Sequence, residues 1–216
     1  MLQLYTYWRS SASYRVRIAL GLKGLAYQPQ FVHLLRGGGE QHGSAFRAVN
    51  PQGRVPALLD GTAIITQSLA IIEYLDETHP LPALLPADAL GRAQVRALAQ
   101  VIACDIQPHQ NTSTTAYLRD TLGASKEQVN AWLQNFIGKG LAAVEVLLAA
   151  QSHGEFCHGG QPGLADCCLV PQCYAARRFG LALNVDQFPR ICAIERACQQ
   201  LSAFVRATPE MQPDRE

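Results

Sequence analysis

A proline-rich segment, LPALLPADALG at residues 81–91, separates two parts of the chain that differ in hydrophobic periodicity. Before this segment, short apolar runs typical of strands alternate with stretches that repeat apolar residues every three or four positions, as helices do. After it, the long segments show only the helical spacing. Because its prolines support neither a helix nor a strand, we interpret residues 81–91 as a linker. The chain is therefore expected to form an α/β domain over residues 1–80 and an all-helical domain over residues 92–216.

The first domain is expected to have the order strand, helix, strand, helix, strand, strand, helix. The expected strands span residues 2–7, 28–33, 57–59 and 63–66, and the expected helices span 13–23, 44–49 and 67–79. Gly24 follows the first helix where a left-handed residue is favoured, and Asp60-Gly61 is typical of a tight turn between strands. In the second domain, apolar stripes predict helices around residues 95–106, 129–148, 164–179 and 188–207.

Composition and charge limit the classes of protein to consider. With 216 residues, 48 % of them hydrophobic, the chain can bury a substantial core. Its formal charge of +1 gives no electrostatic reason to expect a nucleic acid or an acidic membrane as a partner. The start, MLQLYTYWRSS, lacks a signal-peptide pattern, and the apolar segments are expected to be too short or too interrupted by charge to span a bilayer. We therefore expect a cytoplasmic protein.

The seven cysteines are expected to be core residues or mildly exposed thiols. Their odd number, without a secretion signal, argues against a disulfide framework. The chain contains no C-x-x-C, and the Cys157-His158 pair has no partner pair at a spacing typical of zinc sites. The sequence therefore implies no metal.

The stretch YWRSSASYRVRIAL, residues 7–20, places three serines at the expected start of the first helix. A helix start carries about half a positive charge and free N–H groups, so it attracts anions, including a thiolate. Lowering a thiol pKa of ~8.5 by about two units requires roughly 2.7 kcal/mol, which a hydroxyl and a helix start can supply. Alternatively, Ser10, Ser11 and Ser13 only cap backbone N–H groups. This stretch alone favours capping.

Two further stretches allow a functional and an ordinary interpretation. In RVPALLD, residues 54–60, a proline precedes a strand; a cis Val55-Pro56 bond would offer the Val55 backbone to a bound peptide, although cis bonds are uncommon. In TQSLAIIEYLD, residues 66–76, Ser68 either caps the helix or receives a carboxylate. Gln67 beside it offers both a donor and an acceptor.

Together, these three stretches resemble the glutathione transferase family. More closely, RSSASYRVRIALGLKG, NPQGRVPALL, QSLAIIEYL, DIQPHQN and LADCCLVPQ resemble the zeta class of that family. The likeness extends from Tyr5 to the QPD near the end of the sequence. It implies a thioredoxin-like N-terminal domain that binds glutathione, an all-helical C-terminal domain that binds substrate, glutathione as the cofactor, and a homodimer.

The resemblance also assigns site residues. Ser10 and Ser11 match the two motif serines, and Ser11 would hydrogen-bond the glutathione sulfur. Gln41 would meet the glycine end of glutathione, Val55 would pair with its cysteinyl backbone, and Pro56 would be the cis proline. Gln67 and Ser68 would hold the γ-glutamyl carboxylate. The other positions that the resemblance places at the glutathione site are Ala12, Ser13, Tyr14, Arg15, Gln107, Asn111, Thr112 and Ser113.

The chain departs from the family pattern at two positions. Ala12 stands where the usual Ser-Ser-Cys motif has its cysteine. We expect activity to survive with altered rate or substrate range, because glutathione brings its own sulfur. Gly163 stands where a serine or threonine usually caps a helix, a change that costs only a few tenths of a kcal/mol. Asp166 can still reach back to the backbone N–H groups there.

The activity that the resemblance implies is glutathione-dependent cis–trans isomerisation of maleylacetoacetate to fumarylacetoacetate. Arginine suits the two carboxylates of such a substrate, and Arg9 and Arg178 are the candidates, with an ordinary surface role as the alternative. Nothing requires His109 as a base, and His33, His79 and His153 are expected to be ordinary.

Three other functions remain open. The first is isomerisation of maleylpyruvate, although hydroxyls at Thr112 and Ser113, where an extra arginine would favour the shorter diacid, lean towards maleylacetoacetate. The second is general glutathione conjugation or dehalogenation of α-halo acids. The third is a non-catalytic binding module. The retained glutathione-site residues argue against it, namely Ser11, Pro56, Gln67 and Ser68.

Overall fold

The computed structural model describes residues 1–151 and 154–216, and it divides the chain into two compact units. Unit 1 contains residues 1–84 and 199–216, and unit 2 contains residues 85–198. His153 lies outside the described residues.

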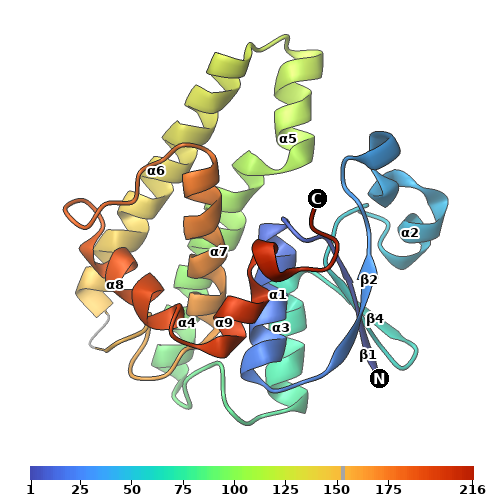
Figure 1. The fold of residues 1–216 in the computed structure, drawn as a ribbon. Coiled ribbons are helices and arrows are strands. Elements are labelled where there is room, and N and C mark those ends of the chain that lie inside the picture. Colours follow the sequence, from blue (N-terminus) through green and yellow to red (C-terminus); the bar gives the residue numbers. More distant parts are fainter. Residues whose placement is uncertain (152–153) are drawn as a thin grey trace. The chain divides into compact units, whose positions relative to one another are not determined.

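Unit 1 is built on a four-stranded sheet in the order β2-β1-β3-β4 (Figure 1). The strands are β1 (Leu2–Thr6), β2 (Tyr27–Phe31), β3 (Ala57–Asp60) and β4 (Ala63–Thr66). The pairing of β1 with β2 is parallel, whereas β1 with β3 and β3 with β4 are antiparallel. The helices between them are α1 (Ser11–Leu22), α2 (Ser44–Val49) and α3 (Ser68–Thr78). The predicted order of elements and the thioredoxin-like fold are confirmed.

Local chemistry explains where these elements end. Gly24 has φ +65°, as the left-handed position after α1 requires, and Gly61 has φ +59° in the turn between β3 and β4. Two short 3₁₀ turns, η1 (Arg36–Gly38) and η2 (Glu40–His42), follow β2, and Gly39 lies between them. α1 and α3 pack against each other, with Ile18 and Ile71 fully buried.

The end of the chain returns to unit 1. Helix α9 (Ser202–Ala207) lies alongside α1 (Figure 1), and a short 3₁₀ turn, η6 (Pro209–Met211), follows it. The helices approach closely because α1 has a glycine at the contact: a Cβ atom on Gly21 would lie 3.1 Å from Cβ of Ala203. Two expectations are therefore corrected. The helical unit ends before residue 199 rather than at 216, and the helix expected over 188–207 is interrupted before α9.

Unit 2 is all-helical, as predicted. Its regular helices are α4 (Ala89–Gln100), α5 (Thr112–Ala116), α6 (Lys126–Gln151), α7 (Leu164–Arg178) and α8 (Pro189–Cys198). Between them lie the π-helical segments η3 (Val101–Ile106) and η5 (Tyr117–Thr121) and the 3₁₀ segment η4 (Gln107–Gln110). Gly140 on α6 lets η3 approach, since a Cβ atom there would lie 2.3 Å from Cγ1 of Ile106.

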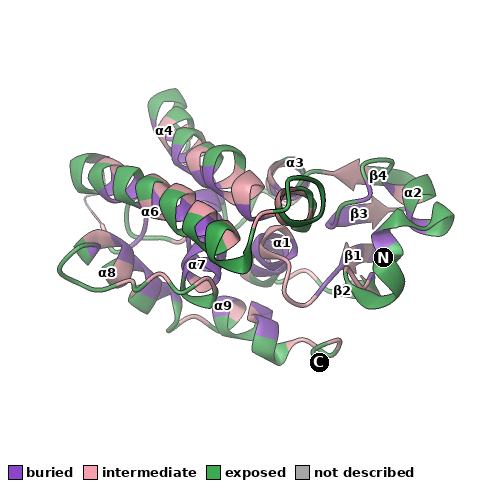
Figure 2. Ribbon diagram, turned by 90° about the horizontal axis from the view of Figure 1, so that it is seen from above, coloured by how far each residue is buried: buried purple, intermediate pink, exposed green. Residues whose placement is uncertain are grey.

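The expectation that every apolar segment is too short or too interrupted by charge to span a bilayer is wrong for helix α6. Residues Lys126–Ala150 are long and apolar enough to cross a bilayer by length and composition. One such helix is weak evidence, and α6 has buried residues along one side and exposed residues along the other (Figure 2). Leu133, Ile137 and Val144 on its buried side belong to the core of unit 2.

All seven cysteines are free. Five are buried in unit 2, Cys192 is half-buried and Cys104 is exposed. Burial raises the pKa of the Cys157 and Cys173 thiols, which keeps them protonated and unreactive. Among the described residues, no group of three or more histidine, cysteine or acidic side chains could hold a metal ion.

Candidate active site

The turn Tyr7–Ser10, called the serine turn below, connects β1 to α1. The N–H of Ser10 donates to the Tyr7 carbonyl at 3.1 Å, and the Ser10 hydroxyl accepts from the N–H of Ser13 at 3.2 Å. Ser10 is thus the N-cap of α1. The half-buried Ser11 hydroxyl forms no hydrogen bond with any described residue. The capping interpretation is therefore correct for Ser10, whereas Ser11 offers a hydroxyl to a ligand at the positive end of the helix.

The next residues of α1 differ in burial. Ala12 is half-buried, whereas Ser13, Tyr14 and Arg15 are buried. The Ser13 hydroxyl has no partner among the described residues. The first turn of α1 contains no acidic side chain that would offset its positive end.

A buried cation lies at the start of α3. The Arg15 guanidinium, only 1 % exposed, donates from Nη1 to the Ser68 hydroxyl at 3.0 Å. The N-cap of α3 is Gln67, which makes no side-chain cap, and the Ser68 hydroxyl accepts from Arg15. Of the two interpretations of Ser68, the structure therefore contradicts capping, and contact with a carboxylate stays a prediction. The first turn of α3 has no acidic side chain, so the positive potential of the helix start is not offset there.

Gln67 is held in an unusual conformation. Its φ of +69° is the single positive value among the described non-glycine residues. This conformation costs on the order of 1 kcal/mol or more, and such strain concentrates at ligand sites. The Gln67 side chain donates from Nε2 to Oε1 of Gln52 at 2.7 Å.

The Val55-Pro56 peptide bond is cis, as the resemblance implies. Asn50 braces the loop before it: Nδ2 donates to the Arg54 carbonyl at 2.6 Å, and Oδ1 accepts from the N–H of Gln52 at 3.1 Å. Neither backbone group of Val55 bonds to another residue of the described chain, which leaves both for an extended, peptide-like ligand. A second cis bond, Leu81-Pro82, lies in the expected linker.

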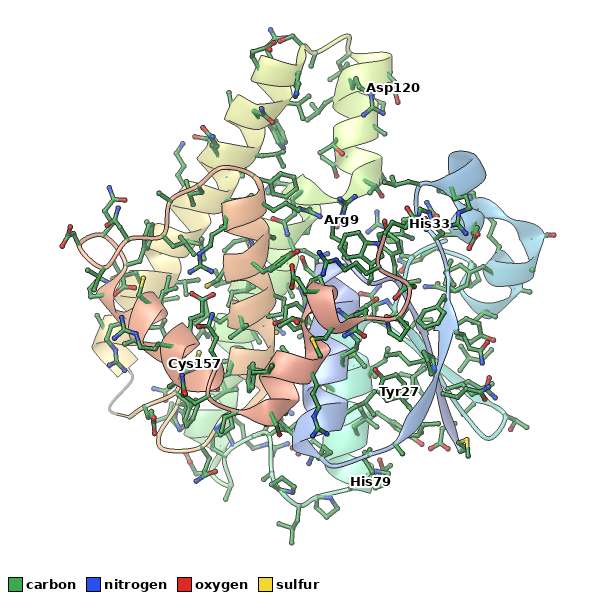
Figure 3. The ribbon with its side chains drawn as sticks, viewed as in Figure 1. Arg9, Tyr27, His33, His79, Asp120 and Cys157 are labelled. Carbon is green, nitrogen blue, oxygen red and sulfur yellow. The ribbon has the colours of Figure 1, made fainter. Side chains whose placement is uncertain are left out.

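Gln41 and Arg9 have different environments. Gln41 is buried and donates from Nε2 to the Leu34 carbonyl at 3.2 Å, while its Oε1 atom has no partner among the described residues. Gln41 thus braces the 33–42 loop, and its contact with glutathione stays a prediction. Arg9 is half-buried, with its guanidinium carbon 5.1 Å from the centre of the Trp8 ring. Figure 3 shows Arg9 and His33 towards one end of unit 1, and Tyr27 and His79 towards the other.

In unit 2, an irregular segment holds four of the predicted residues. The π-helical η3 passes into the 3₁₀ segment η4, and Asn111 then leaves the helix with φ −62° and ψ 147°. Nε2 of Gln107 donates to Oδ1 of Asn111 at 3.0 Å. Thr112 and Ser113 follow as exposed residues at the start of α5. Such π-helical segments are frequent at functional sites.

A buried amide pair, absent from the predicted residues, ties this segment to α7. Gln110 and Gln172 exchange two hydrogen bonds, of 3.3 and 3.0 Å, and are 7 % and 1 % exposed. The sequence signal for it is Gln172, a glutamine within the mostly apolar run of α7; Gln110, in the polar segment QPHQ, carries no such signal.

The two adjacent arginines at the end of α7 have different roles. Arg177 forms a bidentate ion pair with the buried Glu195 and is committed to the structure of unit 2. Arg178 is exposed, and its guanidinium carbon lies 4.4 Å from the centre of the Phe179 ring. The contact of Arg178 with a substrate carboxylate stays a prediction.

Comparisons with known proteins agree with these features. Residues 4–83 match the model of the glutathione S-transferase N-terminal domain. The chain is 50 % identical to a maleylpyruvate isomerase from Ralstonia, covering 99 % of both chains. It is 51 % identical to a maleylacetoacetate isomerase from Pseudomonas aeruginosa, covering 99 % of this chain and 98 % of that protein.

Solved structures show the same likeness. The holo structure of a maleylpyruvate isomerase, described as a bacterial glutathione S-transferase of the zeta class, aligns with a TM-score of 0.94 at 49 % identity over 99 % of this chain and 100 % of that one. A maleylacetoacetate isomerase from Anaeromyxobacter dehalogenans, with glutathione bound in its active site, aligns with a TM-score of 0.87 at 44 % identity. The alignment covers 100 % of this chain and 98 % of that one.

Proposed function

The chain belongs to the zeta class of glutathione S-transferases, and on this basis we propose that it converts maleylacetoacetate to fumarylacetoacetate by glutathione-dependent cis–trans isomerisation. The observation that carries the proposal is the unbonded Ser11 hydroxyl at the start of α1, beside a Ser10 that already caps the helix. Ser11 is therefore available to a ligand without loss of the cap.

The residues of unit 1 fit glutathione. Val55 presents an unbonded N–H and C=O to a peptide-like molecule, and Arg15 with the start of α3 suits a carboxylate. Gln67 and Ser68 lie at that helix start and complete the set of donors. When bound, glutathione supplies a thiolate that adds to the cis double bond, allows rotation about it and leaves again.

The chain's own task is to stabilise the ionised sulfur. The Ser11 hydroxyl donates a hydrogen bond, and the positive end of α1 adds an electrostatic contribution. Together they need to supply roughly 2.7 kcal/mol to lower a thiol pKa by about two units. Ala12 adds no protein thiol, and none is required because the nucleophile comes from the cofactor.

The substrate is proposed to be a small unsaturated diacid. Arg9 and Arg178 are the proposed partners of its carboxylates, because a guanidinium can donate two parallel hydrogen bonds to one carboxylate. Gln107, Asn111, Thr112 and Ser113 are proposed to complete the glutathione site. The family resemblance further supports a homodimer. The near-zero net charge of +1 supports a cytoplasmic enzyme without nucleic-acid or membrane partners.

Maleylpyruvate is the second candidate substrate. The similarity to the Ralstonia maleylpyruvate isomerase, at 50 % identity, is as high as the similarity to the maleylacetoacetate isomerase. The exposed hydroxyls of Thr112 and Ser113 favour the longer substrate.

The test compares both substrates with and without glutathione in wild type, Ser11→Ala and Ser13→Ala. Removing a hydroxyl that stabilises a developing charge typically lowers kcat by about 10²–10³-fold. We expect that loss in Ser11→Ala, and a much smaller loss in Ser13→Ala because the Ser13 hydroxyl is buried. Turnover that is independent of glutathione, or equal losses in the two variants, would contradict the proposal.

A further inference from the structure

The last residues of the chain touch two of the segments of unit 1 to which the resemblance assigns glutathione-binding residues. The N–H of Trp8, in the serine turn, donates to Oδ2 of Asp214 at 2.9 Å. Two residues later, Glu216 pairs with Arg36, and its Oε2 atom lies 3.1 Å from Nε2 of His33. His33 and Arg36 belong to the 33–42 loop that contains Gln41.

The segment that carries these carboxylates is itself anchored. The Gln212 side chain donates from Nε2 to the carbonyls of Arg206 and Thr208, both at 2.9 Å. These bonds brace residues 208–216 on the end of α9, which packs against α1 (Figure 1). Asp214 therefore reaches the serine turn from a support that rests on the same helix that carries Ser11.

The serine turn is held from the inside by a second side chain. The buried Arg17 guanidinium donates to the Tyr7 carbonyl at 3.3 Å and to the Trp8 carbonyl at 2.9 Å. Its Nε atom donates to the Ala207 carbonyl at 3.1 Å, just before the segment that carries Asp214. The Trp8 residue is thus bonded at its C=O by Arg17 and at its N–H by Asp214.

Bonding at both groups restricts rotation of the turn immediately before the two motif serines. A hydroxyl that must stabilise a thiolate needs placement within about 0.5 Å, and a displacement of 1 Å can cost about 10²-fold in rate. The Ser10 cap fixes the helix start but leaves the approach of the chain from β1 undefined. Arg17, through the carbonyls of Tyr7 and Trp8, and Asp214, through the Trp8 N–H, supply that constraint together.

We propose that Asp214 is a positioning residue, whose carboxylate oxygen holds the Trp8 N–H and thereby places the Ser11 hydroxyl for thiolate stabilisation. This inference rests on the proposed function for its consequence in catalysis. The bond itself is a property of the protein alone, so its effect on the turn can be measured without glutathione.

The competing explanation is that Asp214 only compensates the charge of Arg17. Burial lowers the pKa of Arg17 to about 10, and Tyr27 and Asp214 partly offset that effect. Two substitutions separate position from charge. Asp214→Asn keeps an oxygen acceptor in place but removes the charge, whereas Asp214→Glu keeps the charge but moves the acceptor by one methylene.

The experiment measures these two variants beside Asp214→Ala, wild type and Glu210→Gln, a control that changes an exposed carboxylate in the same segment. Amide hydrogen exchange of residues 7–14 is followed without glutathione. The pKa of the enzyme-bound glutathione thiol is then titrated by thiolate absorbance, and kcat and KM are measured for the isomerisation.

We expect wild type, the control and Asp214→Asn to protect the Trp8 amide and to agree within about threefold in kcat. Asp214→Glu and Asp214→Ala should exchange faster in the turn, raise the bound thiol pKa and lose about tenfold or more in kcat, with little change in KM. If Asp214→Ala does not fold, the Asn and Glu variants still give the comparison.

Loss of turn protection in Asp214→Asn equal to that in Asp214→Ala, or an unchanged turn in Asp214→Glu, would overturn the inference. A wild-type protein that forms no bound thiolate would instead contradict the proposed function. In that case, hydrogen exchange in the free protein still decides whether Asp214 holds the turn.

Discussion

The two units bury charges of opposite sign. Within the described chain, every buried charged side chain of unit 1 is a cation, whereas every one of unit 2 is a carboxylate. In chain order, these side chains are Arg15, Arg17, Lys23, Glu145, Asp166 and Glu195.

The buried carboxylates of unit 2 satisfy groups of the protein itself. Asp166 accepts from the N–H groups of Cys157 and Gly163, both at 2.9 Å, as predicted for the start of α7. Glu145 accepts from the N–H groups of Arg190 and Ile191 at the start of α8. Asp166 and Glu145 thus neutralise the positive starts of α7 and α8, which would otherwise attract an anion.

The buried cations of unit 1 donate mostly to uncharged oxygens. Arg15 donates to the Ser68 hydroxyl, and Arg17 donates to three carbonyls and to the Thr6 hydroxyl. The starts of α1 and α3 have no acidic side chain in their first turns. Buried carboxylates therefore neutralise two helix starts of unit 2, whereas the starts of α1 and α3 in unit 1 keep their positive potential, which the proposed function assigns to an anionic ligand.

The largest effect is expected from Arg17→Met, which removes the cation that holds the serine turn. Several buried oxygens lose their donor, and we expect the free energy of unfolding to fall by about 4 kcal/mol. Thiolate formation should weaken as well, because the turn loses its inner support. Urea denaturation and thiolate absorbance measure the two effects, with the exposed Arg47→Met as control. A fall in stability with an unchanged pKa of the bound thiol would show that Arg17 has only a structural role.

Asp166→Ala tests the structural side. Two buried N–H groups lose their acceptor, and we expect a loss of about 3 kcal/mol with normal kcat in the folded protein. The exposed Asp186→Ala is the control. An Asp166→Ala protein of normal stability but impaired kcat would contradict the structural role of the buried carboxylates of unit 2.

The pH dependence of Asp166 has a definite sign. Burial raises its pKa above 3.8, although bonds from the N–H groups of Cys157 and Gly163 oppose the shift. The contribution of Asp166 titration to the free energy of unfolding is therefore fully present below the pKa of the unfolded state. It declines as the pH rises through the pKa of the folded state. Relative to Asp166→Asn, wild type should gain stability as the pH falls through that window, as measured by urea denaturation.

Lys23→Met tests whether a buried cation of unit 1 that lies away from the starts of α1 and α3 affects the bound thiol. Lys23 pairs with Asp76 and donates to the carbonyls of His79 and Pro82, both at 2.7 Å. Asp76 lies in the last turn of α3, and His79 and Pro82 lie beyond its end, so none of the three partners is at the start of the helix. We expect a loss of about 2 kcal/mol and an unchanged bound thiol pKa. A raised thiol pKa in this variant would show that the thiol responds to the total buried charge of unit 1 and not to where each cation lies.

The smallest effect concerns Glu216. Arg36 first, and then His33, lower the pKa of the Glu216 carboxyl below 4.5. Its contact with the 33–42 loop is therefore complete above pH 4.5 and is lost as the pH falls through the lowered value. The protection factors of the amides of residues 33–42, corrected for the intrinsic pH dependence of exchange, should fall over that range in wild type and should be low at all pH values in Glu216→Gln. Protection that persists at low pH would show that the loop does not need this carboxylate.

The sequence alone predicted the parts of the fold that depend on local chemistry. Hydrophobic periodicity and turn residues such as Gly24 gave the order of elements in unit 1. The spacing between Gly163 and Asp166 predicted the start of α7. The serine motif pointed to the start of α1 but did not distinguish the capping Ser10 from the unbonded Ser11. That distinction depends on which hydroxyl faces the N–H of Ser13, and only the structure shows it.

Long-range contacts could not be predicted in the same way. Ser68 looks like a helix cap in sequence, yet its hydroxyl bonds to Arg15, 53 positions earlier. Asp214 looks like part of an irregular end, yet it bonds to Trp8, 206 positions earlier. Propensity and spacing act over a few residues and determine helices, strands and turns. Which buried donor meets which acceptor is decided only when packing brings distant segments together and excludes water from the groups between them.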